Sequence, residues 1–166
     1  MQVRHATAQD AKDVLALVKA KAQFDRGLGA FTGELATTEE LIHRHLFGPR
    51  PIAYALLAGP PEDVAGLALY YFRYSSFKGR PSMWLDDLYI HVPFRRQGTG
   101  GRLMHRLAQV ARDADCTHIA WTASSSNTSG MNFYNRLGAV IIQQIGDSVT
   151  LQIEPAVLLS KTATVE

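Results

Sequence analysis

The apolar positions of this chain recur with two periods, one typical of helices and one typical of strands. Between residues 8 and 24, and in three later segments, apolar residues follow one another at helical spacing, which predicts amphipathic helices. Shorter apolar runs bounded by glycine and proline predict strands. The predicted helices cover residues 8–24, 37–47, 101–114 and 129–137. The predicted strands cover residues 2–6, 52–58, 64–74, 83–92, 117–122, 139–144 and 148–153.

The order of these elements predicts an α/β protein of the α+β type. Three strands follow one another across short turns between residues 52 and 92, which favours antiparallel pairing. The last two strands are expected to pair as a hairpin across Gly146 and Asp147. We therefore expect one domain spanning residues 1–166, with a mixed, mostly antiparallel central sheet of about seven strands flanked by about four helices. After Glu154 we expect an apolar patch and no further element.

Composition and charge argue against several classes of protein. Hydrophobic residues make up 46% and charged residues 19% of the chain, as in soluble globular proteins. A net charge of +2 without a long basic run argues against a nucleic-acid partner. The single Cys116 excludes an internal disulfide, and the scattered histidines suggest no metal site. With no basic-then-apolar leader and no apolar run of membrane-spanning length, we expect a cytoplasmic protein without a membrane partner.

A glycine-rich turn between the fourth predicted strand and the third helix is the strongest local signal. Its residues, in the pattern R-x-x-G-x-G, are Arg95, Arg96, Gln97, Gly98, Thr99, Gly100 and Gly101. Glycines at a helix start expose backbone N–H groups, which together with the helix dipole can bind a diphosphate. The turn lacks the lysine of the NTPase phosphate loop and the glycine order of the dinucleotide fingerprint. The alternative is a tight turn without a ligand.

A second motif follows downstream, in the order Asn127, then Asn132-Phe133-Tyr134-Asn135-Arg136-Leu137-Gly138-Ala139. The two motifs in this order resemble the GNAT N-acetyltransferase superfamily, and the resemblance extends from residue 2 to residue 153. Within that superfamily, residues 65–74, 85–90 and 131–134 are most similar to the diamine (spermidine/spermine) and thialysine acetyltransferases.

The resemblance implies a GNAT fold and acetyl-CoA as cosubstrate, with the glycine turn on its pyrophosphate. Tyr134 would protonate the departing thiolate; its alternative role is to pack a helix onto the sheet. Asn127 would bond the pantetheine arm or cap the following helix. A backbone N–H around Leu88 to Ile90 would donate to the thioester carbonyl, where the central strand separates from its neighbour. The cofactor-binding residues expected are Leu88, Tyr89, Ile90, Arg95, Arg96, Gln97, Gly98, Thr99, Gly100, Gly101, Asn127 and Tyr134.

The substrate amine is expected near two adjacent carboxylates, Asp86 and Asp87. Neighbouring side chains on a strand point to opposite faces. On the resemblance we favour Asp86 as the group that faces the amine and takes its proton, directly or through water; the alternative is a carboxylate bonded to nearby backbone. Asp87 is expected to be structural unless a bulge re-aims it. The substrate-contact candidates are Phe24, Asp25, Asp86, Asp87 and Trp121, with helix-end or core roles as alternatives.

The sequence thus favours an enzyme that acetylates a primary amine of a small molecule in a ternary complex. The acceptor class is a diamine or polyamine, or a lysine-like amino acid. Relatives carry an acidic residue and a tryptophan in the last hairpin, where this chain has Gly146-Asp147-Ser148, so that Asp147 either substitutes for the acid or the acid is lost. Relatives also usually carry glutamate where this chain has the shorter Asp86. A long polyamine is therefore less well supported. The alternatives are an acetyltransferase for an aminoglycoside or a protein amine, a non-catalytic acyl-CoA-binding regulatory module and a nucleotide-binding protein. The resemblance also implies a homodimer.

Overall fold

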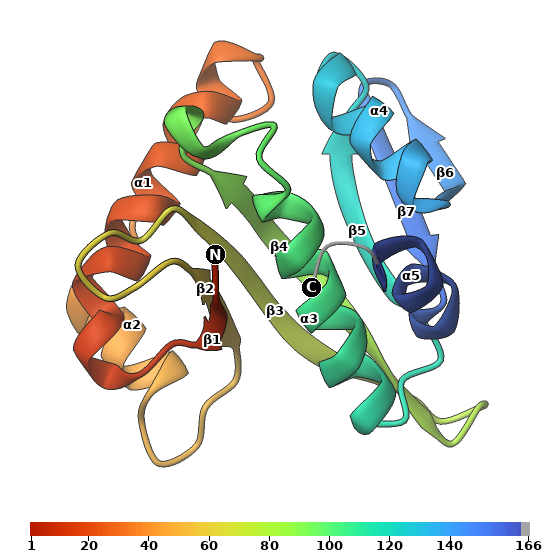
Figure 1. Ribbon diagram of the computed structural model, residues 1–166, viewed down its shortest axis with the longest axis horizontal. Coiled ribbons are helices and arrows are strands. Elements are labelled where there is room, and N and C mark those ends of the chain that lie inside the picture. Colours follow the sequence, from red (N-terminus) through yellow and green to blue (C-terminus); the bar gives the residue numbers. More distant parts are fainter. Residues whose placement is uncertain (164–166) are drawn as a thin grey trace.

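A seven-stranded sheet in the order β1-β2-β3-β4-β5-β7-β6 forms the centre of the molecule. The computed structural model describes residues 1–163. Neighbouring strands are antiparallel except for the parallel pair β4 and β5. The strands are β1 (Val3–His5), β2 (Tyr54–Ala58), β3 (Gly66–Ser75), β4 (Arg80–Ile90), β5 (Ile119–Ser124), β6 (Val140–Ile145) and β7 (Ser148–Ile153). The α-helices are α1 (Ala11–Gly27), α2 (Glu39–Leu46), α3 (Thr99–Asp113), α4 (Thr128–Leu137) and α5 (Pro155–Thr162), and Figure 1 shows their arrangement.

The helices bury both faces of the sheet. Along β2, Leu56 and Ala58 belong to a core cluster with α3, α4 and α5, whereas Ala55 and Leu57 belong to a second cluster with α1 and α2. This division follows the alternation of side chains along a strand. Among residues 1–163, no helix is long and apolar enough to cross a membrane.

The parallel strands β4 and β5 are joined at one end and separate at the other. Their pairing covers Met83 with Ile119 and Trp84 with Ala120, although both strands continue further, and Figure 1 shows them diverging.

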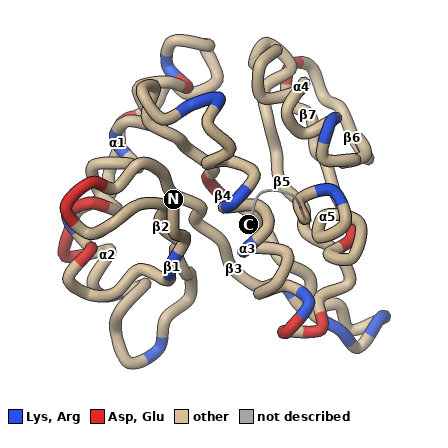
Figure 2. The backbone as a smooth tube through the Cα atoms, viewed as in Figure 1, with Lys and Arg blue, Asp and Glu red and all other residues tan. Residues whose placement is uncertain are grey.

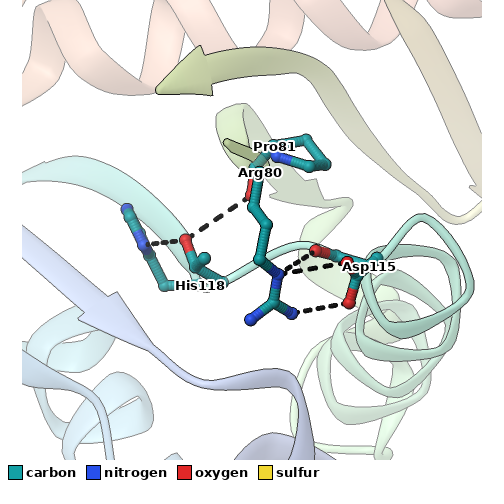
Figure 3. A network of polar contacts seen from close by, with 5 residues as sticks. Arg80, Pro81, Asp115 and His118 are labelled. Atoms are coloured by element: carbon teal, nitrogen blue, oxygen red, sulfur yellow. Dashed lines mark hydrogen bonds and ion pairs between the residues drawn. The ribbon is translucent and has the colours of Figure 1, made fainter. Parts of the chain in front are cut away.

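The joined end of this strand pair is held by a polar network (Figure 3). The Arg80 guanidinium donates to both carboxylate oxygens of Asp115, at 3.1 and 2.6 Å. The N–H of Thr117 donates to Pro81 O at 2.9 Å, and its hydroxyl lies 2.9 Å from His118 Nδ1. The opening between the two strands is therefore confined to the end where β4 leads toward the glycine turn.

A β-bulge in β4 decides which side chains face which helix. Leu69 of β3 pairs with Asp87, but its neighbour Tyr70 pairs with Leu85, so Asp86 is the extra residue. Leu85 lies in the cluster with α3. Tyr89, four residues later and therefore on the same face of a regular strand, lies instead in the cluster with α1. The bulge thus exchanges the two faces and turns Asp87 toward α1.

The α/β fold class, with its mostly antiparallel seven-stranded sheet, is confirmed. The expectation of no element after Glu154 is wrong, because α5 forms there and packs on α3. Leu158 of α5 is completely buried in the larger core cluster, so the apolar patch is the inner face of a helix. The helices predicted to end at residue 24 and to begin at residue 101 instead end at Gly27 and begin at Thr99.

Candidate active site

Helix α3 begins at the glycine turn with backbone N–H groups that have no partner within the helix. Gly98 caps this helix in the left-handed region, with φ 81°. The first helical bond joins the N–H of Arg102 to Gly98 O at 3.0 Å, so the N–H groups of Thr99, Gly100 and Gly101 have no acceptor one turn earlier in the helix. A Cβ built on Gly98 would meet no atom within 4 Å. The space beside Gly98 is therefore free of side chains, and free N–H groups at a helix start favour an anion.

Two polar side chains of the turn bond its own backbone. Thr99 is buried, and its hydroxyl donates to Phe94 O at 3.2 Å. Gln97 Nε2 donates to Pro93 O at 2.7 Å. These bonds fix the path of the turn, so the predicted ligand contacts of both residues would come from their backbone rather than from these side-chain groups.

The two arginines of the turn have different surroundings. Arg95 Nε donates to Ile90 O at 2.8 Å, and its guanidinium lies 4.9 Å from the ring centre of Phe24 and 5.5 Å from that of Tyr89. Arg96 is exposed, with φ 60°. Figure 2 marks the basic stretch between β4 and α3 in blue. Arg96 is therefore the freer of the two charges, and Arg95 and Phe24 together hold the turn against α1.

The Phe133 side chain of α4 reaches the start of α3. A Cβ on Gly100 would come within 3.3 Å of the Phe133 ring, so the absence of a side chain there permits this close approach. Asn127 caps α4, since its Oδ1 accepts the N–H of Gly130 at 3.0 Å. The capping alternative for Asn127 is thus observed, and a bond from its amide to a ligand stays a prediction.

Tyr134 of α4 is buried between aromatic side chains and near two carboxylates. Its ring centre lies 5.0 Å from that of Trp121 and 5.4 Å from that of Phe133. Burial raises the pKa of Tyr134, and the charges of Asp25 and Asp87 raise it further. The phenol therefore holds its proton at neutral pH. Trp121 is 2% exposed and belongs to the core, which is the alternative that the sequence left open for it.

Backbone donors of β4 face the opening beside β5. The N–H of His91 donates to Ala65 O at 2.9 Å, toward β3. Successive N–H groups of an extended strand point to opposite edges. The N–H groups of Leu88 and Ile90 accordingly point away from β3, to the side that β5 has left, whereas that of Tyr89 points toward β3.

An acidic cavity of about 150 Å³ lies between α1, the loop after it and β4. Asp25 and Asp87 both line it, together with Lys21. The Lys21 ammonium bonds the Asp25 carboxylate and lies 3.5 Å from Asp87 Oδ1. Burial raises the pKa of Asp87, opposed by the Lys21 charge and supported by those of Asp86 and Asp25.

The two adjacent carboxylates are placed differently from the sequence expectation. Asp87, expected to be structural, faces the cavity, and Asp86, expected to face the amine, is exposed at the bulge. The alternative given for Asp87, a bulge that re-aims it, is the one observed, because a bulged residue is outside the regular alternation and the residue after it changes face. A role for Asp86 in proton transfer through water stays a prediction.

Asp147 is hydrogen-bonded to the loop between β5 and α4. Its carboxylate accepts hydrogen bonds from the hydroxyls of Ser124, Ser125 and Ser126 and from the N–H of Ser126 at 2.9 Å. These hydroxyl bonds hold the pKa of Asp147 well below its usual range. Asp147 thus stabilises the loop that leads to Asn127.

Sequence reasoning missed five of the seven residues that line the cavity, namely Val18, Lys21, Ala22, Phe31 and Leu35. A signal existed for Lys21, because Lys21 and Asp25 are four residues apart in a predicted helix and so share a face. Phe31 and Leu35 lie in an irregular loop whose path no sequence period describes.

Comparison with known proteins agrees with this geometry. The family described as "Acetyltransferase (GNAT) family" matches residues 23–139. A thialysine N-epsilon-acetyltransferase from Bos taurus is 30% identical over 147 residues, which cover 84% of this chain and 84% of that protein. The spermidine/spermine N(1)-acetyltransferase-like protein 1 from Homo sapiens is 31% identical over 146 residues, which cover 84% of this chain and 20% of the human protein.

A solved structure supports the fold independently. The PaiA N-acetyltransferase from Thermoplasma acidophilum in complex with coenzyme A matches with a TM-score of 0.71 over 92% of this chain and 98% of its own, at 11% identity. At that identity the likeness concerns the fold alone. Taken with the family match over more than half of the sequence, these findings mean that the chain belongs to the GNAT family and is an acetyltransferase related to the thialysine and polyamine acetyltransferases.

Proposed function

We propose that this acetyltransferase moves the acetyl group of acetyl-CoA directly onto the primary amine of a small molecule while both substrates are bound. One observation carries the proposal: Asp25 and Asp87 line one cavity, beyond the point where the pairing of β4 with β5 ends, and their charges act on the buried phenol of Tyr134. Carboxylates bind an ammonium group and a phenol can protonate a thiolate, so these groups match the needs of acetyl transfer to an amine.

The glycine turn and β4 would bind the acetyl donor. The free N–H groups of Thr99, Gly100 and Gly101 suit a pyrophosphate at the positive end of α3, with Arg96 adding charge. The N–H of Leu88 or Ile90 would donate to the thioester carbonyl oxygen. Such a donor stabilises the charge that develops on that oxygen and is worth about 3 kcal/mol of barrier.

The acidic groups would bind and deprotonate the acceptor. An amine binds as its ammonium form, to Asp87 and Asp25, and must lose a proton before its nitrogen attacks the acetyl carbon. Asp86, exposed beside Asp87, would receive that proton through water. After the attack, the nitrogen would lose its remaining extra proton to water as the amide forms. As the carbon–sulfur bond breaks, Tyr134 would give its proton to the thiolate and later regain one from solvent.

The proposal extends to a finer class of acceptor: a diamine, a polyamine or a lysine-like amino acid, in keeping with the names of the relatives.

We also propose a homodimer. The edge strand β6 exposes Val140, Ile141, Ile142 and Ile145 by 55%, 55%, 52% and 69%, and an apolar sheet edge of this kind favours association. We further propose a cytoplasmic location, because a single buried Cys116 without a disulfide suits a reducing compartment.

The test is thiol release from acetyl-CoA over a panel of primary amines, with the acetylated amine identified by mass. We expect turnover with at least one small amine, and a large loss of kcat/KM in Asp87→Asn. Asp63→Asn, which removes an exposed carboxylate from the turn before β3, is the matched control. Binding of CoA without turnover on any amine would contradict the proposal and indicate a non-catalytic module.

A further inference from the structure

A lysine of the chain lies where the proposed function places the ammonium group of the acceptor. The Lys21 ammonium bonds Asp25 Oδ2 and lies 3.5 Å from Asp87 Oδ1. These are the two carboxylates to which we assign the acceptor ammonium, and all three residues line the same cavity. The cavity thus already contains a primary amine that belongs to the protein.

The side chain of Lys21 has the chemistry of the proposed acceptors. It carries a primary amine at the end of a flexible four-carbon chain, and diamines and lysine-like amino acids likewise carry primary amines on hydrocarbon chains. Phe31 and Leu35 supply apolar walls to the cavity, which suit the hydrocarbon part of either amine. Lys21 therefore matches the expected acceptor in charge, in chemical type and in position.

The groups proposed to carry out acetyl transfer lie close to the carboxylates that Lys21 contacts. The charges of Asp25 and Asp87 act on the buried phenol of Tyr134. The N–H groups of Leu88 and Ile90, proposed to bind the thioester carbonyl, come one and three residues after Asp87 in β4. Because the lysine side chain is flexible, its nitrogen can leave the carboxylates and approach a thioester bound beside them.

Lys21 does not cancel the negative charge that attracts an acceptor. Asp86, whose charge acts on Asp87, adds a third carboxylate to Asp25 and Asp87. With all four groups ionised, three negative charges face one positive charge. An acceptor with one or two ammonium groups is therefore still attracted and can displace Lys21 from the carboxylates, so the lysine is compatible with a diamine as acceptor.

The accessibility of Lys21 differs from that of the other lysines. Its side chain is 21% exposed. The other four lysines of the chain are exposed: Lys12, Lys19, Lys78 and Lys161. Uncatalysed reaction with acetyl-CoA would favour the exposed amines, whereas transfer at the site would favour Lys21. The identity of the lysine that becomes acetylated therefore distinguishes the two routes.

We propose that Lys21 is a site of self-acetylation: when acetyl-CoA is bound and no acceptor is present, the enzyme transfers the acetyl group to the Lys21 nitrogen of the same chain. This inference rests on the proposed function, because it uses the same cavity and the same proton donor.

The reaction follows the steps proposed for a free amine. The Lys21 ammonium loses one proton to water, and its nitrogen then forms a bond to the acetyl carbon. The carbon–sulfur bond breaks, the thiolate takes the proton of Tyr134, and the nitrogen loses a second proton to water as the amide forms. Tyr134 regains a proton from water. The products are acetyl-lysine, CoA with a free thiol and one released proton.

The test incubates the purified protein with acetyl-CoA in the absence of amine and locates the acetyl group by peptide mass spectrometry. Lys21 should be acetylated at least about tenfold faster than Lys19, an exposed lysine of the same helix, and Tyr134→Phe should slow the reaction at Lys21 by roughly 10²-fold. A saturating amine from the panel should protect Lys21 and leave the slow reaction of Lys19 unchanged. Lys21→Arg keeps the charge, and it should lose the acetyl group at this position alone.

Several results would overturn the inference. Equal rates at Lys21 and Lys19 would mean uncatalysed acetylation, as would a rate at Lys21 that neither the amine nor Tyr134→Phe lowers. A rate per chain that rises with protein concentration would mean transfer between molecules instead of within one chain. If an amine is turned over and Lys21 stays unmodified, only the role of Lys21 fails. If neither an amine nor Lys21 receives the acetyl group, the proposed function itself fails.

Discussion

Replacing Tyr134 with phenylalanine removes one hydroxyl group from the candidate site and leaves the ring packing in place. Tyr134 is 9% exposed, and its ring contacts Trp121 and Phe133, contacts that phenylalanine retains. Within residues 1–163 its hydroxyl makes no hydrogen bond. The change in the free energy of unfolding should therefore be below about 1 kcal/mol.

The expected effect on turnover is much larger. A positioned acid contributes roughly 10²–10⁴-fold to a rate, and burial keeps the pKa of Tyr134 above its ordinary value, so that the phenol is a proton donor throughout the neutral range. We expect kcat to fall by roughly 10²–10³-fold, which corresponds to about 3–4 kcal/mol of barrier. KM should change by less than about threefold, because the hydroxyl acts after binding.

The assay is thiol release at saturating acetyl-CoA with the best amine of the panel, together with urea unfolding of each variant. Tyr70→Phe is the matched control, since Tyr70 is 2% exposed in β3 and loses the same hydroxyl outside the site. Its kcat should remain that of the wild type. If Tyr134→Phe turned over at the wild-type rate with unchanged stability, the phenol would not be the proton donor.

Three further changes probe the framework around the site by unfolding measurements. Asp10, 4% exposed and bonded to Arg4 at 2.8 and 2.7 Å, has its pKa lowered from 3.8 to about 2. Asp10→Asn should therefore cost about 2 kcal/mol at neutral pH, and this difference should shrink as pH falls from about 4 toward 2; a difference that persisted at pH 2 would refute the ion pair as its source. Leu158→Ala, at 0% exposure, should cost about 2–5 kcal/mol, and a loss below about 1 kcal/mol would mean that α5 does not pack as described. Gly138→Ala, at φ 86°, should cost about 1 kcal/mol through left-handed strain alone; unchanged stability would argue against that conformation.

Much of the fold was predictable because it rests on periodic burial. The period of α1 and the short apolar runs of the strands identified their elements, and Gly98 marked the turn before α3. Helix α5 was missed because its eight residues are apolar on more than one side, so no clear helical period distinguishes them from an apolar tail. Its position is decided by packing on α3, which is a tertiary effect.

The residues of the candidate site that belong to short sequence motifs were predictable. Those whose position depends on strand pairing or on contacts between distant segments were less so. The exposed start of α3 and the position of Tyr134 follow from short motifs. The roles of Asp86 and Asp87 depend on a bulge in β4, which arises from pairing with β3 and has no signal in the sequence of β4 alone. The contact of Lys21 with Asp87 joins a helix and a strand far apart in the sequence, and only the folded chain shows it.

The most direct test of the account is an amide ¹H–¹⁵N spectrum of glycine-labelled protein titrated with CoA and, separately, with pantetheine, which lacks the diphosphate. If the start of α3 binds the diphosphate through its backbone, the resonances of Gly100 and Gly101 should shift with CoA and remain in place with pantetheine. If CoA binds and these two resonances do not move, the diphosphate lies elsewhere and the assignment of the glycine turn is wrong.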